Sequence, residues 1–422
     1  MSGPVANNIF RSSGVIAAAA GGLSWQAVVT ASTLTAEAGN GYLINTTSNT
    51  CTITLPASAE AGDQIIFVDY ARTWGTYKII IDSNGLKYQG DADTFTVEYN
   101  TSGQTVSIVY SGATVGWIPE DDDDVTDAPV QPVTQKAIFG FGKASSVTNI
   151  SNLVNSSGVV ATDTTGVGTA REALVATGYG FDKGIFGYGA NGGPTSVTNL
   201  VSNSGVVATD TTGVGSARYG AAAAIYGGDK GIVGFGNSGS VTAITNLVTN
   251  AGVVGTDVTG VGTARAELAA CSYGSDKAIF AFGNNPAPYT AISNLVSNVG
   301  VVATDTAGVG TIRHRLAACG YGGDKGIFGY GAGSTPKMSM TSLVSSSGVI
   351  SADVTGVGTA RIFPAAAGYG GDKGIFAYGQ DNPAPHYSMS NLVSNSGVVA
   401  TDTTGVGTGR NALAACGYSN SA

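Results

Sequence analysis

Residues 355–379 read TGVGTARIFPAAAGYGGDKGIFAYG, and both halves of this segment recur along the chain. The first half, Gly-Val-Gly-(Thr/Ser)-(Ala/Ile/Gly)-Arg, occurs six times, with its arginines 47–49 residues apart. The second half, Lys-(Gly/Ala)-Ile-(Phe/Val)-(Gly/Ala)-(Phe/Tyr)-Gly, also occurs six times, starting at Lys136, Lys183, Lys230, Lys277, Lys325 and Lys373. A fixed period of this length is typical of repeat architectures such as solenoids and propellers.

Each repeat predicts four short strands separated by Gly- and Asn-rich turns. The first two are illustrated by Leu316–Tyr321 and Lys325–Tyr330 around a Gly-Gly-Asp turn, the last two by Val197–Val201 and Val206–Thr209 around Asn-Ser-Gly. A loop of variable sequence separates the second and third strands. Four strands in about 47 residues is the pattern of a β-propeller blade.

The two ends of the repeat array complement each other. The first copy begins at its second strand, at Lys136, and the last stops after a lone first strand, Leu413 to Tyr418. The C-terminal strand can therefore complete the first blade, which removes exposed sheet edges. We predict a six-bladed β-propeller over 136–422. A linear β-solenoid is the alternative, but it does not explain why the partial units match.

A small residue stands six positions after each repeat arginine, as expected for the crowded innermost strand. These residues are Thr177, Ala224, Cys271, Cys319, Ala367 and Cys416. Buried free cysteine behaves as a small apolar residue. The alternative is a ring of metal-binding thiols, but half the positions lack sulfur and none has the close pair spacing of a zinc site.

The repeat resembles the first half of a Kelch repeat. The resemblance rests on Arg361, on AAAGYG over 365–370 and on KGIFAYG over 373–379, and it covers 136–418. The Gly-Gly doublet that ends the second Kelch strand is here Gly-Tyr-Gly, Gly-Phe-Gly or Ala-Tyr-Gly, and the Trp after the third strand is absent. The resemblance implies a Kelch-like propeller.

An aspartate precedes each repeat arginine by eight residues. The twelve residues are Asp163, Arg171, Asp210, Arg218, Asp257, Arg265, Asp305, Arg313, Asp353, Arg361, Asp402 and Arg410. We interpret them as structural ion pairs or backbone clamps that link neighbouring blades, because they recur in every unit. The alternative is a charged ring around one channel mouth that binds an ion or a sugar.

Residues 25–119 contain no copy of the repeat and predict a small antiparallel β-sandwich or jelly roll. We expect Trp25 and Trp117 to help close its core, and Cys51 to be reduced or buried. The short apolar runs that predict its strands are 25–31, 41–46, 51–55, 64–70, 77–81, 94–99 and 105–110.

The same segment resembles the N-terminal modules of tailed-bacteriophage virion proteins, especially tail-fibre-like proteins of aquatic phages. The motifs are GYLINTTS over 41–48, TLPAS over 54–58, GDQI over 62–65, DYARTWGT over 69–76 and GWIP over 116–119. The resemblance implies a virion component with N-terminal attachment and C-terminal display. It also implies other virion proteins as partners of the N-terminal region and a virion location, after assembly in the host cytoplasm.

Two further segments flank this domain. We expect 1–24 to be an attachment arm that orders on a partner, although Gly14–Ala20 could imitate a signal-peptide core. Residues 120–135 contain Glu120 and Asp121–Asp124, which favour a solvated, self-repelling linker. A calcium site there is the alternative, without the ligand spacing of an EF-hand.

Composition argues against most enzyme classes. The 422 residues include 64 Gly, only 2 His and 4 Cys, and the net charge is −9, which disfavours nucleic acid and anionic lipid as partners. No apolar run is long enough to span a bilayer. No catalytic triad, metal motif or helix-associated phosphate loop is visible. We therefore predict a non-enzyme with no cofactor and no metal, which leaves a secreted glycan-modifying enzyme as the third reading.

The loops between second and third strands differ in every copy, and variable loops on a rigid scaffold are where binding sites usually lie. They span 143–145, 190–194, 237–239, 284–289, 332–338 and 380–387, and two of them, 284–289 and 380–387, are stiffened by two prolines each. The ligand-binding candidates are Tyr289, Lys337, Met338, His386 and Tyr387. We expect these to recognise a host-surface polysaccharide, in a homo-oligomer. The alternatives are loops that contact nothing and a purely architectural propeller that docks other virion proteins.

Overall fold

The computed structural model describes residues 23–91, 97–120, 134–285, 289–381 and 383–421, and within them the protein is all-β, with no helix. These residues accordingly contain no helix of a length and apolarity that could cross a bilayer. The chain divides into two compact units, Met1–Pro132 and Val133–Ala422, which are described separately below. The expected arm over 1–24 and the acidic linker over 120–135 lie mostly outside the described residues.

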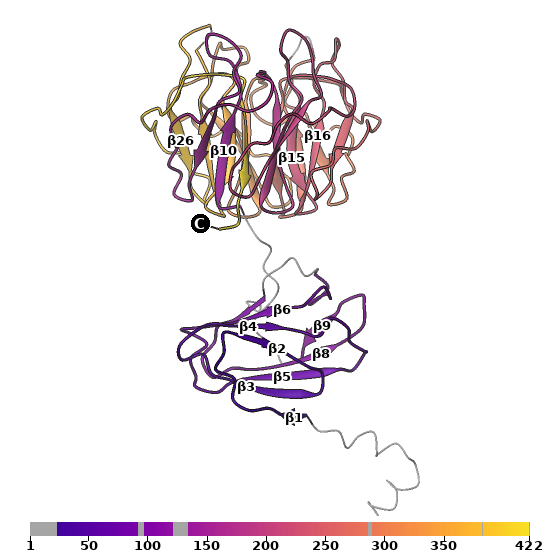
Figure 1. Ribbon diagram of the computed structural model, residues 1–422. Coiled ribbons are helices and arrows are strands. Elements are labelled where there is room, and N and C mark those ends of the chain that lie inside the picture. The colour runs from indigo at the N-terminus through magenta and orange to yellow at the C-terminus, as the bar shows by residue number, and fades with distance from the viewer. Residues whose placement is uncertain (1–22, 92–96, 121–133, 286–288, 382, 422) are drawn as a thin grey trace, which may run out of the picture. The chain divides into compact units, whose positions relative to one another are not determined.

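The N-terminal unit consists of two sheets that stack as two layers (Figure 1). The five-stranded sheet has the order β1 (Ser24–Trp25), β3 (Asn40–Ile44), β5 (Gln64–Asp69), β8 (Thr105–Tyr110) and β9 (Trp117–Pro119). The four-stranded sheet has the order β2 (Thr33–Thr35), β4 (Cys51–Thr54), β6 (Ile79–Asp82) and β7 (Val97–Tyr99).

The expectation of a purely antiparallel sandwich is wrong for this unit. The pairs β1–β3, β3–β5, β2–β4 and β4–β6 are all parallel. The reason is the path of the chain, which alternates between the two sheets from β1 to β6. A strand that is reached by crossing to the opposite sheet and back arrives in its original direction, so neighbours within a sheet run parallel.

The core of this unit lies between its sheets. Ile53 of one sheet and Phe67 of the other are fully buried there, together with Trp74 and Trp117. The expectation for Trp25 is wrong, because its side chain is 54% exposed. Trp25 sits in the two-residue edge strand β1 and lies over Gly41, where a Cβ would come within 2.7 Å of its ring.

The described residues of the C-terminal unit form six three-stranded sheets, numbered I to VI here. Sheet I comprises β27 (Ala414–Tyr418), β10 (Lys136–Gly140) and β11 (Ser151–Val154); sheet II, β12 (Val175–Tyr179), β13 (Lys183–Gly187) and β14 (Thr198–Val201); sheet III, β15 (Ala222–Tyr226), β16 (Lys230–Gly234) and β17 (Thr245–Val248). Sheet IV comprises β18 (Ala269–Tyr273), β19 (Lys277–Ala281) and β20 (Ser293–Val296); sheet V, β21 (Ala317–Tyr321), β22 (Lys325–Gly329) and β23 (Thr341–Val344); sheet VI, β24 (Ala365–Tyr369), β25 (Lys373–Ala377) and β26 (Ser390–Val393).

The two ends of the repeat array meet in sheet I. The C-terminal strand β27 pairs antiparallel with β10, in a register that runs from Lys136 opposite Tyr418 to Gly140 opposite Ala414. The first strands of successive sheets, β12, β15, β18, β21, β24 and β27, contact one another in this order, and β27 also contacts β12. Strands β10, β15, β16 and β26 of this unit are labelled in Figure 1.

The expected fourth strand of each repeat is not a regular strand. It forms only two isolated bridges to the third strand, for example Val201–Val207 and Thr198–Thr211 in sheet II. In sheet II the side chain of Asn199 lies in the gap between the two bridges, and its Nδ2 atom donates to the carbonyl of Ala208 at 3.0 Å; sheet V has Ser342 at this position and the same two bridges. A side chain thus takes a carbonyl that would otherwise belong to the backbone ladder. Sheets I, III, IV and VI repeat this contact with Asn152, Asn246, Asn294 and Asn391.

Packing between neighbouring sheets matches small residues to larger ones. The small first-strand position of one sheet lies against the residue after the second-strand lysine of the next sheet. Where the first is Cys or Thr the second is glycine: Cys416–Gly184, Thr177–Gly231, Cys271–Gly326 and Cys319–Gly374. In the remaining two pairs, Ala224–Ala278 and Ala367–Ala137, both members are alanine, and each pair shares one buried cluster. The summed volume at the contact is thereby kept nearly constant, as close packing requires.

Candidate functional site

The C-terminal unit has two chemically different ends. We call the turn end the one that carries the turns between first and second strands. The chain arrives at this end, since the Gln135 amide donates to the Ser419 carbonyl and the Gly370 amide donates to the Gln135 carbonyl. The C-terminus marked in Figure 1 also lies there. The opposite end, called the loop end, carries the variable loops and the segments that lead to the repeat arginines.

The six repeat arginines lie near the loop end and are fully buried. Arg218 is representative: its Nε atom donates to the Phe235 carbonyl at 2.9 Å and its Nη2 atom to Asn246 Oδ1 at 2.7 Å. Its guanidinium lies 4.3 Å from the centre of the Tyr188 ring in the preceding sheet. The equivalent rings are Phe141 for Arg171, Phe235 for Arg265, Phe282 for Arg313, Tyr330 for Arg361 and Tyr378 for Arg410.

Each repeat aspartate approaches the repeat arginine that leads into its own sheet, and not the one eight residues after it, which leads into the next sheet. Asp257 accepts hydrogen bonds from the Ser216 amide at 3.1 Å and the Ser216 hydroxyl at 2.6 Å, two residues before Arg218. The resulting partners are Asp210 with Arg171, Asp257 with Arg218, Asp305 with Arg265, Asp353 with Arg313, Asp402 with Arg361, and Asp163 with Arg410. The last of these joins residues 247 positions apart, Asp163 and Arg410, at 4.0 Å. The hydrogen bonds therefore clamp the segment that enters each sheet to the fourth segment of the same sheet, and only the stacked ring connects the arginine to the preceding sheet.

Electrostatics keep both partners of the clamp ionised. Burial lowers the pKa of Arg171 and of Arg265 to about 10, which leaves both guanidinium groups charged at neutral pH. Partial burial opposes the ionisation of Asp163, but hydrogen bonds from Thr408 and Asn152 and the charge of Arg410 outweigh it, so its pKa is below the ordinary value. The guanidinium groups of the clamp donate to protein acceptors, except that Nε of Arg313 and Nε of Arg361 are buried without a hydrogen-bond partner.

Three of the five predicted loop residues meet between sheets V and VI. Lys337 Nζ lies 2.5 Å from Asp381 Oδ2, and the Tyr387 hydroxyl donates to the same oxygen at 3.3 Å. Met338 is buried next to them and forms a backbone bridge to Arg361. The hydrogen bond from Lys337 to Asp381 raises the pKa of the amine, while burial and the Asp381 charge raise that of Tyr387. This half-exposed group offers a cation, a carboxylate and a phenol within one small surface.

The other two predicted residues lie in separate groups. His386 Nε2 is 3.0 Å from Gln380 Oε1, which also accepts from the Asn411 amide. Tyr289 of the sheet IV loop stacks on the His314 ring of sheet V, with ring centres 4.1 Å apart and an angle of 10° between the planes. The five residues therefore lie over sheets IV, V and VI without forming a single pocket.

The sequence reasoning missed a second set of residues at the loop end. The second residue after each repeat arginine joins a cyclic series of six backbone hydrogen bonds, in which each amide donates to the carbonyl of the preceding member. The members are Ala173, Gly220, Glu267, Arg315, Phe363 and Ala412. Three are small and three are large or charged, and the large ones belong to sheets IV, V and VI. The sequence signal that could have identified this set is the change from a small residue to a large or charged one at the same repeat position.

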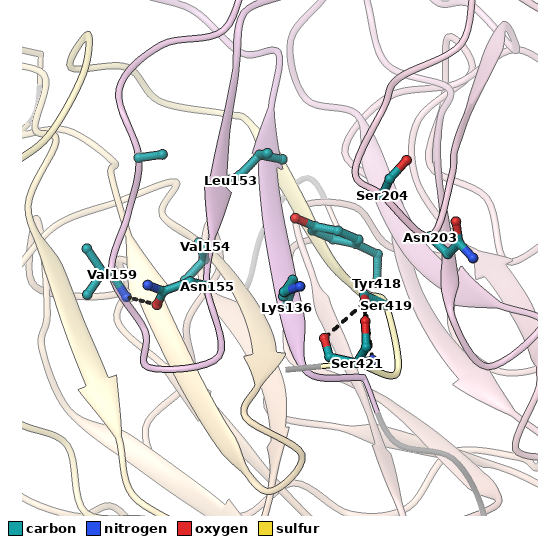
Figure 2. A pocket seen from close by; sticks show the side chains of 11 residues that line it. Lys136, Leu153, Val154, Asn155, Val159, Asn203, Ser204, Tyr418, Ser419 and Ser421 are labelled. Carbon is teal, nitrogen blue, oxygen red and sulfur yellow. Dashed lines mark hydrogen bonds between the residues drawn. The ribbon is translucent and has the colours of Figure 1, made fainter. Parts of the chain in front are cut away.

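A pocket of about 530 Å³ lies at the turn end, where β10 and β27 meet the turn around Asn203 of sheet II (Figure 2). Lys136 and Tyr418 line it, with Leu153, Val159 and Ser204. The other five second-strand lysines each pair with a preceding aspartate at 2.5–2.8 Å, whereas Lys136 follows Gln135 and has no carboxylate partner among the described residues. The pocket therefore lies beside the sheet in which the two ends of the repeat array are paired.

The described residues contain no group of three or more His, Cys, Asp or Glu side chains arranged to hold a metal ion. All four cysteines are buried and free. Burial raises the pKa of Cys319 and of Cys416 to about 12 and that of Cys51 to about 11, so these thiols stay protonated at neutral pH. Compared with known proteins, the chain matches no family model and no curated protein.

Proposed function

We propose that the chain is a fibre-like structural protein of a bacteriophage virion, whose loop end binds polysaccharide on the host surface. The observation that carries the recognition role is the concentration of diverse side chains over sheets IV, V and VI of an otherwise repetitive unit. Lys337, Asp381 and Tyr387 form one group there, and Tyr289 with His314 forms another. Aromatic faces beside paired hydrogen-bonding groups suit the recognition of sugars. The virion role rests on the resemblance of the N-terminal segment.

We further infer that the six sheets are the blades of a closed, Kelch-like β-propeller. The pairing of β27 with β10 and the contact of β27 with β12 support it. Two series of six backbone hydrogen bonds also support closure, because each returns to the sheet where it starts. One is the loop-end series; the other, at the turn end, runs Gly180 to Asp229, Gly227 to Asp276, Gly274 to Asp324, Gly322 to Asp372, Gly370 to Gln135 and Ser419 to Asp182. A closed ring supplies the rigid scaffold that binding loops need.

The location of the loops fits a display role. Within the C-terminal unit the chain arrives at the turn end, as the hydrogen bonds of Gln135 indicate, so the variable loops occupy the far end. A propeller tethered through one end can present the other to a large polymer without interference from its own linker. A polymer that meets several blades at once can also bind through many weak contacts.

The full chain, immobilised or labelled, should be tested on an array of bacterial surface polysaccharides. We expect binding to at least one polymer that is weakened about tenfold or more by Lys337→Ala combined with Tyr387→Phe. Lys143→Ala is the matched control, since Lys143 pairs with Glu172 at 3.3 Å on the same end but over sheets I and II. Unchanged binding by the double variant would show that the binding site lies outside the Lys337 group. A correctly folded chain that binds no polymer would contradict the proposed recognition of polysaccharide.

A purely architectural role is the second candidate, and one observation favours it. The first residue of every fourth segment is an exposed valine, with exposed fractions of 61–65%: Val159, Val206, Val253, Val301, Val349 and Val398. A repeated set of exposed apolar residues can form a docking surface for protein partners. Under this alternative the chain binds no surface polysaccharide, and Val206→Ser with Val253→Ser reduces the amount of the chain in purified particles, measured by mass spectrometry.

A further inference from the structure

Three side chains at the mouth of the proposed propeller axis form a contact chain of their own. Arg315 Nε donates to Glu267 Oε2 at 3.1 Å, and the Arg315 guanidinium lies 4.8 Å from the centre of the Phe363 ring. The three residues come from sheets IV, V and VI and occupy equivalent positions in the loop-end hydrogen-bond series. They are the three members of that series that have large side chains.

These side chains are not needed by the backbone that carries them. At the same position the other sheets have Ala173, Gly220 and Ala412, with the same hydrogen bonds. All six residues adopt positive φ, from 48° at Ala412 to 61° at Gly220, a conformation that disfavours residues with side chains. Large side chains kept at such a position, where glycine would suffice, point to a role beyond folding.

The contact chain extends through a buried histidine to an aromatic ring. His314 Nε2 lies 3.5 Å from Glu267 Oε2, and Asn284 Nδ2 donates to the same oxygen at 3.2 Å. His314 is held in place by its Nδ1 contact with the Ala332 carbonyl at 2.9 Å and by the stacked ring of Tyr289. Tyr289, His314, Glu267, Arg315 and Phe363 thus form one continuous chain of contacts, which we call the axial cluster.

The axial cluster has hydrogen-bonding capacity that the protein leaves unused. All contacts of Glu267 involve Oε2, so Oε1 is without a partner among the described residues. The terminal nitrogens of Arg315 likewise make no hydrogen bond to the described residues, and its side chain is 32% exposed. A hydrogen-bond acceptor, Glu267 Oε1, and the donors of the Arg315 guanidinium therefore lie close together, next to aromatic rings.

The charges of the cluster are balanced before any ligand binds. Arg315 and Glu267 neutralise each other at 3.1 Å. Burial lowers the pKa of His314, with the nearby Glu267 charge opposing this only in part, so the imidazole is neutral at pH 7. An anionic ligand would bring an uncompensated charge to Arg315 and be repelled by Glu267, whereas a neutral one would not.

We propose that the axial cluster is the binding site for an uncharged sugar unit with adjacent hydroxyl groups. One hydroxyl would donate to Glu267 Oε1, neighbouring oxygens would accept from the Arg315 fork, and the C–H face of the ring would pack on an aromatic side chain. This inference rests on the proposed recognition of polysaccharide and names the site and the sugar class. It differs from the Lys337 group, which lies between sheets V and VI.

The first test needs no variant. Phenylglyoxal modifies exposed arginines, and the six repeat arginines are fully buried, whereas Arg72 and Arg315 are accessible in the two units. Mass spectrometry of the full chain with and without a neutral oligosaccharide identified on the array should show at least fivefold slower modification at Arg315 and no change at Arg72. Equal rates at Arg315 in both samples would overturn the site.

The second test uses variants and separates this inference from the proposed function. Glu267→Gln and Arg315→Lys should each weaken binding of the neutral oligosaccharide about tenfold, with unchanged melting temperature, and Glu172→Gln should have no effect. Binding should also change less than twofold between 50 and 500 mM salt. If only the Lys337 and Tyr387 variants weaken binding, polysaccharide recognition stands and the axial cluster is not the site. Binding restricted to acidic polymers and lost at high salt overturns the assignment of an uncharged sugar.

Discussion

The Sγ atom of Cys319 packs directly against Gly374 in the neighbouring sheet: a Cβ atom at residue 374 would lie 2.6 Å from it. The same contact in the next pair of sheets joins Ala367 to Ala137. One extra heavy atom on one side is thus matched by one fewer on the other. This relation holds for the three Cys–Gly pairs and the two Ala–Ala pairs, while threonine adds two heavy atoms in the sixth pair, Thr177–Gly231. It explains why each cysteine at this position stands opposite a glycine.

The complementarity predicts a compensating pair of substitutions. Gly374→Ala should lower the free energy of unfolding by about 1–3 kcal/mol, because the new methyl group overpacks the contact with Cys319. Adding Cys319→Ala should recover most of that loss, since the pair then matches the natural Ala367–Ala137 pair. Urea unfolding of the two single variants and the double variant measures the coupling. Losses that simply add would show that the sheets do not share this contact.

The buried arginine clamp predicts a large effect from a single residue. Arg218→Met removes the donors to the Phe235 carbonyl and to Asn246 and leaves both acceptors buried. We expect a loss of at least about 2 kcal/mol in the free energy of unfolding. Lys143→Met is the control, because Lys143 is 47% exposed and its pair with Glu172 contributes about 0–1 kcal/mol. Equal effects in the two variants would contradict the clamp.

The repeat aspartates predict sensitivity to acid. Hydrogen bonds and the nearby arginines lower the pKa of Asp163, Asp257 and their four equivalents in the folded state, against the opposing effect of partial burial. A carboxyl with a lowered pKa contributes stability above its unfolded value, and that stability is lost as the pH falls through the folded value. The melting temperature should therefore drop below about pH 4. Asp257→Asn should lower the melting temperature at pH 7 and reduce the further drop in melting temperature at low pH. If the variant shows the same drop as the unmodified protein, the clamp is not the source of the acid sensitivity.

Burial predicts unreactive thiols. Because burial raises the pKa of Cys51, Cys319 and Cys416 well above neutrality and also raises that of Cys271, none of the four should react with a thiol-specific disulfide reagent in the native chain at pH 8. All four should react after denaturation. Rapid labelling of any cysteine under native conditions would show that its sheet opens, and peptide mapping identifies which one.

The features of the fold that could be predicted from the sequence are those that depend on local or repeated interactions. The repeat motif and the small first-strand residues each occur six times, so a chance pattern is excluded, and the matching ends at Lys136 and Tyr418 follow from the same period. The strands of the N-terminal sheets run parallel because successive strands join alternate layers. The sequence of a single strand does not specify which layer it joins. Asn199 was not recognised as the side chain that lies between the two bridges of the fourth segment, because its partner carbonyl is nine residues away.

The candidate site shows the same division. The variable loops led to two residues that lie together, because Lys337 and Tyr387 both contact Asp381, and their role in ligand binding stays a prediction. Glu267, Arg315 and Phe363 were missed because they differ from the residues at the same position in the other repeats. The prediction relied on residues that the repeats share, such as the arginine two positions earlier. Their contact depends on neighbouring sheets bringing residues 48 positions apart together, Glu267 and Arg315 among them.

The most direct test of the central claim is hydrogen–deuterium exchange of the full chain with and without a bound surface polysaccharide. We predict slower exchange in the loop-end segments of sheets IV, V and VI, in peptides covering 284–289, 332–338 and 380–387. The corresponding segments at 143–145 and 190–194 should be unchanged and serve as internal controls. Protection confined to the turn end, or to the N-terminal unit, would contradict recognition by the loop end.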